Sequence, residues 1–187
     1  MVYGHTDLKI GTLVELDGVP YRVTDYSHKA MGRGGAVVQV KIKNLLTGGV
    51  VEKSFRSSDK IASADVTRAN MQLLYRSEEG LVFMNNETYD QDTVSEDVLG
   101  DQAKYVADST NVSLLYFNGR VIGLEVPNAV YLAVTETEPG AKGDTATTAL
   151  KPATLETGVQ VMVPLFINEG DRIKVNTLSG DYLERAK

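Results

Sequence analysis

The sequence has no cysteine and only two histidines, His5 and His28, in 187 residues. A chain without cysteine forms no disulfide, offers no thiol nucleophile and holds no zinc through thiolates. Neither histidine stands in a pattern with Ser or Asp that would indicate a nucleophilic triad, so we interpret both as surface residues. Thiol chemistry is excluded, and hydrolysis by a triad has no candidate residues.

Signatures of other enzyme classes are missing too. The phosphate-binding motif GxxxxGK[ST] does not occur, and His, Asp and Glu residues do not cluster at metal-ligand spacing. The acidic pairs at 78–79 and 96–97 are adjacent in turn-like segments, where solvated charge is the expected role. We therefore predict no catalytic residue, no metal and no cofactor, and we do not expect an enzyme.

Long hydrophobic runs are also absent. Apolar stretches stay well below the ~18 residues that a membrane span needs, and the N-terminal residues lack a basic segment followed by an apolar core. With 42% hydrophobic and 24% charged residues, the composition is typical of a soluble globular protein. We expect a cytoplasmic protein with no membrane partner.

Charge is divided unevenly along a chain whose net charge is −6. Residues 1–60 hold nine Lys/Arg and six Asp/Glu, whereas residues 61–187 hold ten and nineteen. The N-terminal part is therefore basic in an acidic chain, which favours binding of a phosphate-rich partner at that end. The alternative is an ordinary solvated strand face. The basic residues concerned are Lys41, Lys43, Lys53, Arg56 and Lys60.

A glycine-flanked basic loop, residues 27–35, lies in this basic part. Gly32, Gly34 and Gly35 surround Arg33, and glycine neither favours a helix nor gives a strand a side chain to bury. We therefore predict the tip of a β-hairpin, with the guanidinium of Arg33 held out from the body of the protein. Such a tip suits contact with a phosphate-rich or polar target.

The dominant hydrophobic period is two, which predicts strands rather than helices. Asp17-Gly18 and Asn118-Gly119 predict two-residue hairpin turns, because both positions of such a turn need positive φ angles. One short helix is predicted at 95–99, after a Ser cap. Strands are predicted at 13–16, 19–23, 36–43, 50–55, 71–75, 81–84, 112–117, 120–124, 130–134, 172–175 and 182–183. These short strands and turns indicate small β-barrels.

A second polar loop is predicted from Pro139 to Thr148. Gly143 frees the backbone there, while Asp144 and Thr145 offer acceptors and donors that suit base edges or riboses. A purely structural loop has a similar composition, so the residues alone leave both interpretations open.

Taken together, the chain resembles the bacterial elongation factor P family. The resemblance runs in order through essentially the whole chain. Its motifs lie at 17–21, 43–48, 51–55, 83–89, 139–145, 151–158, 163–166 and 180–185. It implies an all-β fold of three small β-barrel domains in an L-shaped, tRNA-like arrangement: a KOW-like barrel over 1–63, then OB-fold barrels over 64–128 and 129–187.

The resemblance also implies a function. Family members bind the ribosome between the peptidyl and exit sites, contact rRNA of both subunits and peptidyl-tRNA, and rescue ribosomes stalled at consecutive prolines. They position the CCA end of peptidyl-tRNA rather than supply a catalytic acid or base. We expect a monomer. Two alternatives remain: an elongation-factor-P-like paralogue with a related role, and a generic RNA-binding β-barrel protein.

Carried onto this sequence, the family's tip residue falls on Arg33. Gly32 and Gly34 match the family pattern, whereas Met31 replaces a proline and Arg33 replaces the more usual lysine. A tip arginine excludes lysine-directed modification and makes Arg33 a candidate for rhamnosylation by a tip-modifying enzyme, with the unmodified guanidinium as the alternative. Lys29 is a second cationic contact in the loop.

The polar loop is also matched by the family. By the same transfer, Gly143, Asp144 and Thr145 correspond to a loop near the small subunit's exit-site codon. The resemblance therefore favours the functional interpretation of this loop over the structural one.

Overall fold

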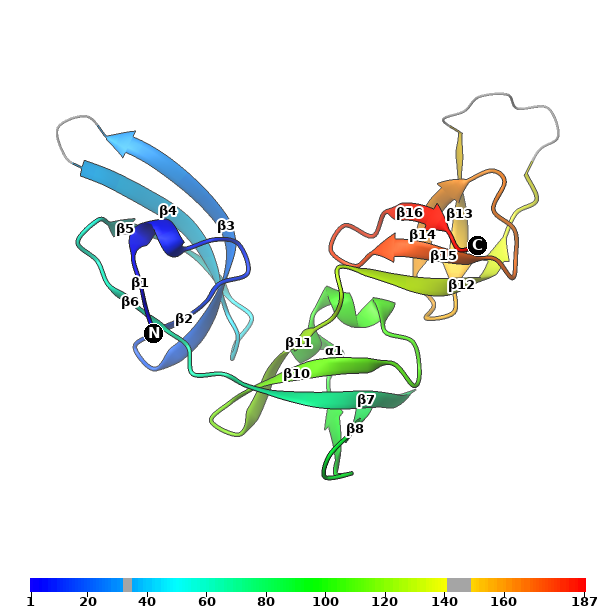
Figure 1. The fold of residues 1–187 in the computed structure, drawn as a ribbon, viewed down its shortest axis with the longest axis horizontal. Helices are drawn as coiled ribbons and strands as arrows, with labels where there is room; N and C mark the ends of the chain where they lie inside the picture. Colours follow the sequence, from blue (N-terminus) through cyan, green and yellow to red (C-terminus); the bar gives the residue numbers. More distant parts are fainter. Residues whose placement is uncertain (32–34, 141–148) are drawn as a thin grey trace. The chain divides into compact units, whose positions relative to one another are not determined.

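A computed structural model describes residues 1–31, 35–140 and 149–187. These residues form three β-sheets of six, five and five strands (Figure 1). Their helices are one four-residue α-helix and two short 3-10 helices, and none is long and apolar enough to cross a membrane. The chain is therefore all-β, as its period-two hydrophobic pattern predicts.

The first sheet has the strand order β1-β6-β2-β3-β4-β5. Asp17 and Gly18 join β2 to β3 with φ angles of 52° and 75°, so the predicted hairpin turn is confirmed. The strands of this sheet are β1 (Val2–Tyr3), β2 (Leu13–Leu16), β3 (Val19–Met31), β4 (Gly35–Asn44), β5 (Val50–Arg56) and β6 (Ile61–Ser63).

Strand β3 is longer than the predicted strand at 19–23. It pairs with β4 in antiparallel register from Tyr21↔Asn44 to Met31↔Gly35, with one irregularity after Val23. Residues 27–31 were expected in the loop, and this part of the prediction is wrong. Ser27, His28 and Lys29 are polar and show no apolar alternation in the sequence, and the backbone pairing with β4 is what extends the strand.

The second sheet has the strand order β11-β10-β7-β8-β9. Asn118 and Gly119 have φ angles of 49° and 77°, which confirms the second predicted hairpin turn. A short helix α1 (Glu96–Leu99) follows Ser95, although the Ser95 side chain makes no capping hydrogen bond. The strands are β7 (Thr67–Ser77), β8 (Gly80–Asn85), β9 (Gln91–Val94), β10 (Asn111–Phe117) and β11 (Arg120–Glu125).

The third sheet has the strand order β14-β13-β12-β15-β16. Two of its strands were not predicted, and each contains a proline, Pro152 in β13 and Pro164 in β14. Proline donates no ladder hydrogen bond and argues against a strand at the sequence level. The strands are β12 (Ala129–Thr137), β13 (Leu150–Leu155), β14 (Gln160–Pro164), β15 (Arg172–Asn176) and β16 (Tyr182–Arg185).

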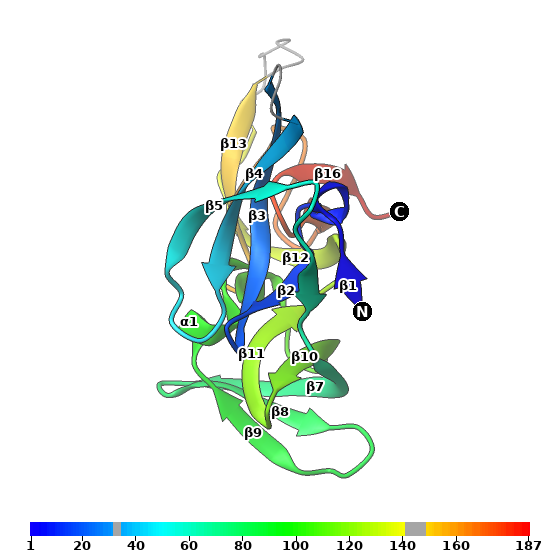
Figure 2. The same cartoon turned by 90° about the vertical axis from the view of Figure 1, so that its left-hand side faces the viewer.

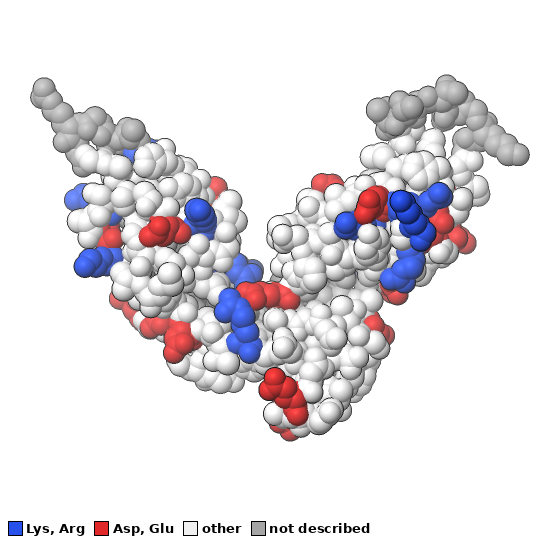
Figure 3. Space-filling view, in the orientation of Figure 1, with Lys and Arg blue, Asp and Glu red and all other residues white. Residues whose placement is uncertain are grey.

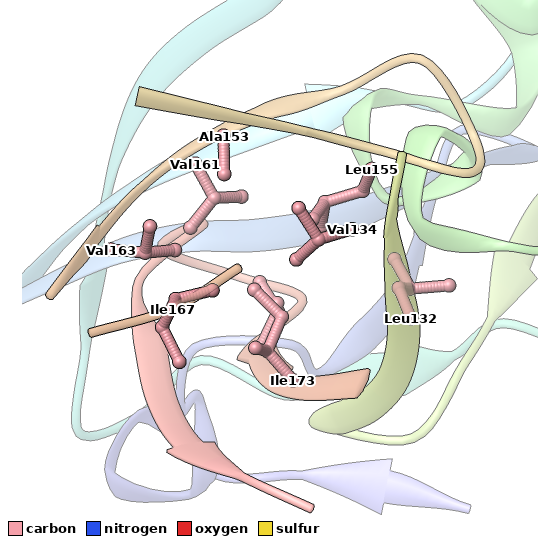
Figure 4. Close-up of a cluster of buried hydrophobic side chains, with 9 residues drawn as sticks. Leu132, Val134, Ala153, Leu155, Val161, Val163, Ile167 and Ile173 are labelled. Atoms are coloured by element: carbon pink, nitrogen blue, oxygen red, sulfur yellow. The ribbon is translucent and has the colours of Figure 1, made fainter. Parts of the chain in front are cut away.

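The first and third sheets each surround a hydrophobic cluster of their own. The cluster of the third sheet is drawn from four of its strands and from Ile167, and most of the labelled side chains point toward one another (Figure 4). Leu8 from the N-terminal segment joins Val23, Val38 and Ile42 in the cluster of the first sheet. Alternate strand residues supply these cores, which is the burial pattern of small barrels.

Contacts divide the chain into two compact units. One comprises Met1–Arg68 with Leu115–Gly123, and the other comprises Ala69–Leu114 with Leu124–Lys187. Leu115 and Ile122, from the β10–β11 hairpin, are buried in the first unit in a cluster with Leu13 and Leu45. The end of this hairpin therefore shares a core with the N-terminal residues.

Candidate functional site

The predicted tip connects β3 and β4, which pair with each other as a ribbon, and β4 also pairs with β5 from Val37 to Lys43. Strands β3 and β4 lie side by side in both views (Figures 1 and 2). Met31 pairs with Gly35, so three residues of sequence connect the paired strand ends. Gly35 has a φ of 84°, which residues with a side chain rarely adopt. Gly32, Arg33 and Gly34 lie outside the described residues.

The register of the ribbon selects two of the predicted basic residues. Lys29 pairs with Val37, and Val37 pairs with Arg56 on its other side. Side chains of directly paired residues share one face of a sheet, so Lys29 and Arg56 flank Val37 on one face. Both side chains are exposed. Because they lie two strands apart, the usual spacing between neighbouring strands puts their Cα atoms at a distance of about 10 Å. Two cations are thus placed near the tip.

Lys41 is placed differently. It pairs with Asp25 on β3 and with Glu52 on β5, so two carboxylates flank it in the ladder. Opposite charges directly across strands attract one another and offset the charge that a partner would meet. On the face visible in Figure 3, basic and acidic side chains are interspersed. Among the described residues, the register therefore favours Lys29 and Arg56 over Lys41 as contacts for a polyanion.

The second predicted loop is described only at its two ends. Gly143, Asp144 and Thr145 lie outside the described residues. At the ends, the Thr137 hydroxyl donates to the Pro152 carbonyl at 2.9 Å, and the ammonium of Lys151 donates to the Glu138 carbonyl. A Cβ on Gly140 would lie 2.5 Å from the Leu165 carbonyl oxygen. The chain is thus held closely where it enters and leaves residues 141–148.

A further polar surface on the third sheet was not predicted. The Lys174 ammonium lies 3.1 Å from the Glu184 carboxylate and 5.6 Å from the Tyr131 ring centre, and the Tyr131 hydroxyl donates to Glu184 at 3.1 Å. These contacts lower the pKa of Glu184, chiefly through the Lys174 hydrogen bond. They raise the pKa of Lys174, chiefly through the same bond.

An aromatic ring and a guanidinium lie on this sheet as well. The Arg185 guanidinium is 5.6 Å from the ring centre of Phe166, which is 59% exposed, and 3.9 Å from the Asp171 carboxylate. The groove beside Tyr131 has a volume of about 650 Å³ and is lined mainly by charged residues of β15, β16 and the C-terminal segment. In the sequence, this surface could have been recognised from the alternation of Arg172 and Lys174 with the apolar residues of β15.

The described residues offer no metal centre, since no three of their His, Asp or Glu side chains are grouped to hold an ion. The arrangement instead provides the paired strands β3 and β4, two exposed cations near their end and, in another sheet, close contacts on either side of residues 141–148. Such features suit binding and positioning.

Comparison with sequence models of known families covers most of the chain. The model for the elongation factor P KOW-like domain matches residues 5–61. The model for the elongation factor P OB domain matches residues 66–124, and that for the elongation factor P C-terminal domain matches residues 130–185. The chain belongs to the elongation factor P family.

Curated relatives named elongation factor P match at full length. The protein of Helicobacter hepaticus is 46% identical over 187 residues, which is 100% of both chains. That of Oleidesulfovibrio alaskensis is 44% identical over 184 residues, 98% of this chain and 100% of the relative. That of a Synechococcus species is 48% identical over 179 residues, 96% of this chain and 97% of the relative.

The fold was also compared with solved structures, and one of the structures found is a translation factor by its title. It is titled eukaryotic translation initiation factor 5A from Methanococcus jannaschii and aligns with 66% of this chain and 95% of its own, at 21% identity and a TM-score of 0.47.

The family assignment confirms the resemblance and the all-β fold with KOW-like and OB domains. This elongation factor P family member is a translation elongation factor. The domain boundaries at 63 and 128 stay predictions, as do the roles of Met31, Gly32, Arg33, Gly34 and Lys29 and of Gly143, Asp144 and Thr145.

Proposed function

We propose that this family member binds the ribosome between the peptidyl and exit sites and stimulates peptide-bond formation at consecutive prolines. The proposal places the Arg33 loop against the CCA end of peptidyl-tRNA. The observation that supports this proposal is the pairing of Met31 with Gly35, because it means that two hydrogen-bonded strands lead to and from the Arg33 loop. A paired ribbon can present a short loop with little loss of conformational entropy on binding.

The proposed mechanism is positioning, and the chain acts without a catalytic acid or base. Proline reacts slowly because its ring restricts the backbone. A protein that holds the CCA end in a reactive geometry lowers the barrier by removing unproductive arrangements. A guanidinium suits this task, because it is always charged and its planar head contacts a phosphate or stacks on a base.

The placement of two exposed cations beside Val37 supports this proposal. Lys29 and Arg56 lie on one face near the end of β3–β4, where they would meet the phosphates of a bound RNA. Gly143, Asp144 and Thr145, which lie between β12 and β13 in the sequence, would contact the exit-site codon. The protein would act as a monomer in the cytoplasm, with rRNA of both subunits and peptidyl-tRNA as partners.

The replacement Arg33→Ala tests the proposal. We expect at least a roughly tenfold loss of rescue on a polyproline reporter, with unchanged folding, because the tip contact is lost while the ribbon pairing remains. Arg120→Ala is the matched control, since Arg120 is exposed on β11. Full rescue by Arg33→Ala would remove Arg33 from its proposed role.

The chemical state of Arg33 needs its own measurement. The intact mass of protein purified from its native host separates a deoxyhexose-modified Arg33 from the bare guanidinium. Arg33→Lys complements it, because lysine keeps the charge but loses the planar fork. Full rescue by Arg33→Lys would show that charge alone is sufficient.

A further inference from the structure

One lysine of the third sheet is buried. Lys151 is 5% exposed. It lies on the same face of β13 as Ala153 and Leu155, which are buried in the hydrophobic cluster. Burying an ammonium group is costly unless hydrogen bonds compensate it. Methionine would fill the same space without that cost. A charged residue at this position therefore has a task other than filling the core.

The contacts of Lys151 indicate what this task is. Its ammonium donates to the carbonyl of Glu138, the residue that directly follows the end of β12. The neighbouring Thr137 is held as well: its hydroxyl donates to the Pro152 carbonyl at 2.9 Å, and its amide donates to the Glu169 carboxylate at 3.3 Å. The end of β12 is thus tied to β13 by side chains.

A second close approach lies two residues further on. A Cβ on Gly140 would lie 2.5 Å from the Leu165 carbonyl oxygen, so this position has no room for a side chain unless the backbone moves. Leu165 directly follows β14. Residues 138–140 are therefore held from β13 on one side and from the end of β14 on the other.

We infer that Lys151 is a positioning residue that fixes the Glu138 carbonyl and with it the place where the chain enters the segment of Gly143, Asp144 and Thr145. This inference rests on the proposed role of those three residues at the exit-site codon. Lys151 itself touches no RNA. It acts through the backbone at 138–140. The hydrogen bond from its ammonium to the Glu138 carbonyl also offsets part of the cost of burying that charge.

The test replaces Lys151 by methionine, which keeps an unbranched side chain as far as the ε position and removes the ammonium donor. We expect rescue on the polyproline reporter to fall by roughly tenfold, because small displacements of a positioning group reduce rates strongly. We expect the thermal midpoint to stay within roughly 2 °C, because replacing a buried charge with an apolar side chain of similar volume is often neutral. Lys104→Met is the control, since Lys104 is an exposed lysine.

A second measurement is independent of the ribosome. Amide hydrogen exchange in the peptide covering residues 136–140 should be about tenfold faster in Lys151→Met than in the parent or in Lys104→Met, because a local tie is lost. Unchanged exchange overturns the inference. A large drop in the thermal midpoint also overturns it, because the residue would then be a core element without a specific effect on 138–140.

Asp144→Ala separates this inference from the proposed function. If Asp144→Ala lowers rescue and Lys151→Met adds no further loss in the double variant, Lys151 acts through the loop as inferred. If the two losses multiply, Lys151 acts elsewhere and the inference fails. If Asp144→Ala keeps full rescue, the proposed role of the loop fails, and the exchange measurement alone then decides whether Lys151 positions residues 138–140.

Discussion

At the scale of single residues, the cross-strand register decides which charges can meet a partner. Lys29, Lys41 and Arg56 are all exposed cations. Lys41 lies between Asp25 and Glu52 in the ladder, whereas Lys29 and Arg56 flank the apolar Val37. A net charge summed over residues 1–60 hides this difference. Lys29 and Arg56 each pair with Val37, so neither has a carboxylate directly opposite it, whereas Lys41 has two.

The Lys174–Glu184 pair gives a prediction at the same scale. Replacing Lys174 by methionine should raise the pKa of Glu184 toward its ordinary value, because the hydrogen bond to Lys174 is the largest cause of its lowering. Carbon-13 NMR titration of the Glu184 carboxyl measures this change. Lys104→Met is the control and should leave the Glu184 titration unchanged; an unchanged titration in Lys174→Met would contradict the assignment.

The two pKa shifts also determine how the contribution of this ion pair to folding stability changes with pH. Because the folded-state pKa of Glu184 is lowered, its contribution to stability is present above its unfolded-state pKa and is lost as the pH falls through the folded value. Because the folded-state pKa of Lys174 is raised, its contribution is present below its unfolded-state pKa and is lost as the pH rises through the folded value. At neutral pH both contributions are present.

At the scale of elements, a glycine allows strands β8 and β9 of the second sheet to approach each other closely. Gly80 begins β8 with a φ of 140°, and a Cβ there would overlap the Val94 carbonyl oxygen on the neighbouring strand β9. Gly80→Ala combines a strained backbone with a steric clash, so we expect a loss of about 2–4 kcal/mol in the free energy of unfolding. Urea denaturation followed by circular dichroism measures it.

Gly158 provides the matched control for Gly80. It has a φ of 85° in a turn, and a Cβ there would meet nothing within 4 Å. Gly158→Ala carries backbone strain without a clash, so it should cost only about 1 kcal/mol. Equal losses in the two variants would show that the approach of Val94 contributes nothing.

The elements that the sequence predicted and those that it missed differ in what stabilises them. Asp17-Gly18 and Asn118-Gly119 form the expected turns, because positive φ angles are a local property of these residues. Strands β13 and β14 contain prolines, and β9 has three polar residues among its four. Pairing with neighbouring strands is what makes these segments extended, and single-sequence periodicity does not contain that pairing.

At the scale of the molecule, the β10–β11 hairpin contributes to a core outside its own sheet. Ile122 is 1% exposed in a cluster with Leu13, Leu45 and Val66. We expect Ile122→Ala to lower the free energy of unfolding of the first unit by about 2–4 kcal/mol, because a buried side chain is lost from a core built by distant segments. Urea denaturation of the full chain measures this loss.

Val121 is the matched control on the same strand. It is half-buried and stands next to Ile122 in β11, so its side chain points to the other face. Val121→Ala should cost less than half as much as Ile122→Ala. A loss equal to that of Ile122→Ala would mean that the cluster does not stabilise the first unit specifically.

The sequence by itself determined the all-β class, the two glycine hairpin turns, the charge division and the family, because these depend on residue types and their order along the chain. Tertiary structure alone decided that Lys29 and Arg56 share a face, that Lys41 lies between carboxylates, and that Lys151 is buried with its ammonium on the Glu138 carbonyl. The physical reason is that cross-strand register and burial are set by pairing between distant segments, which no local preference specifies.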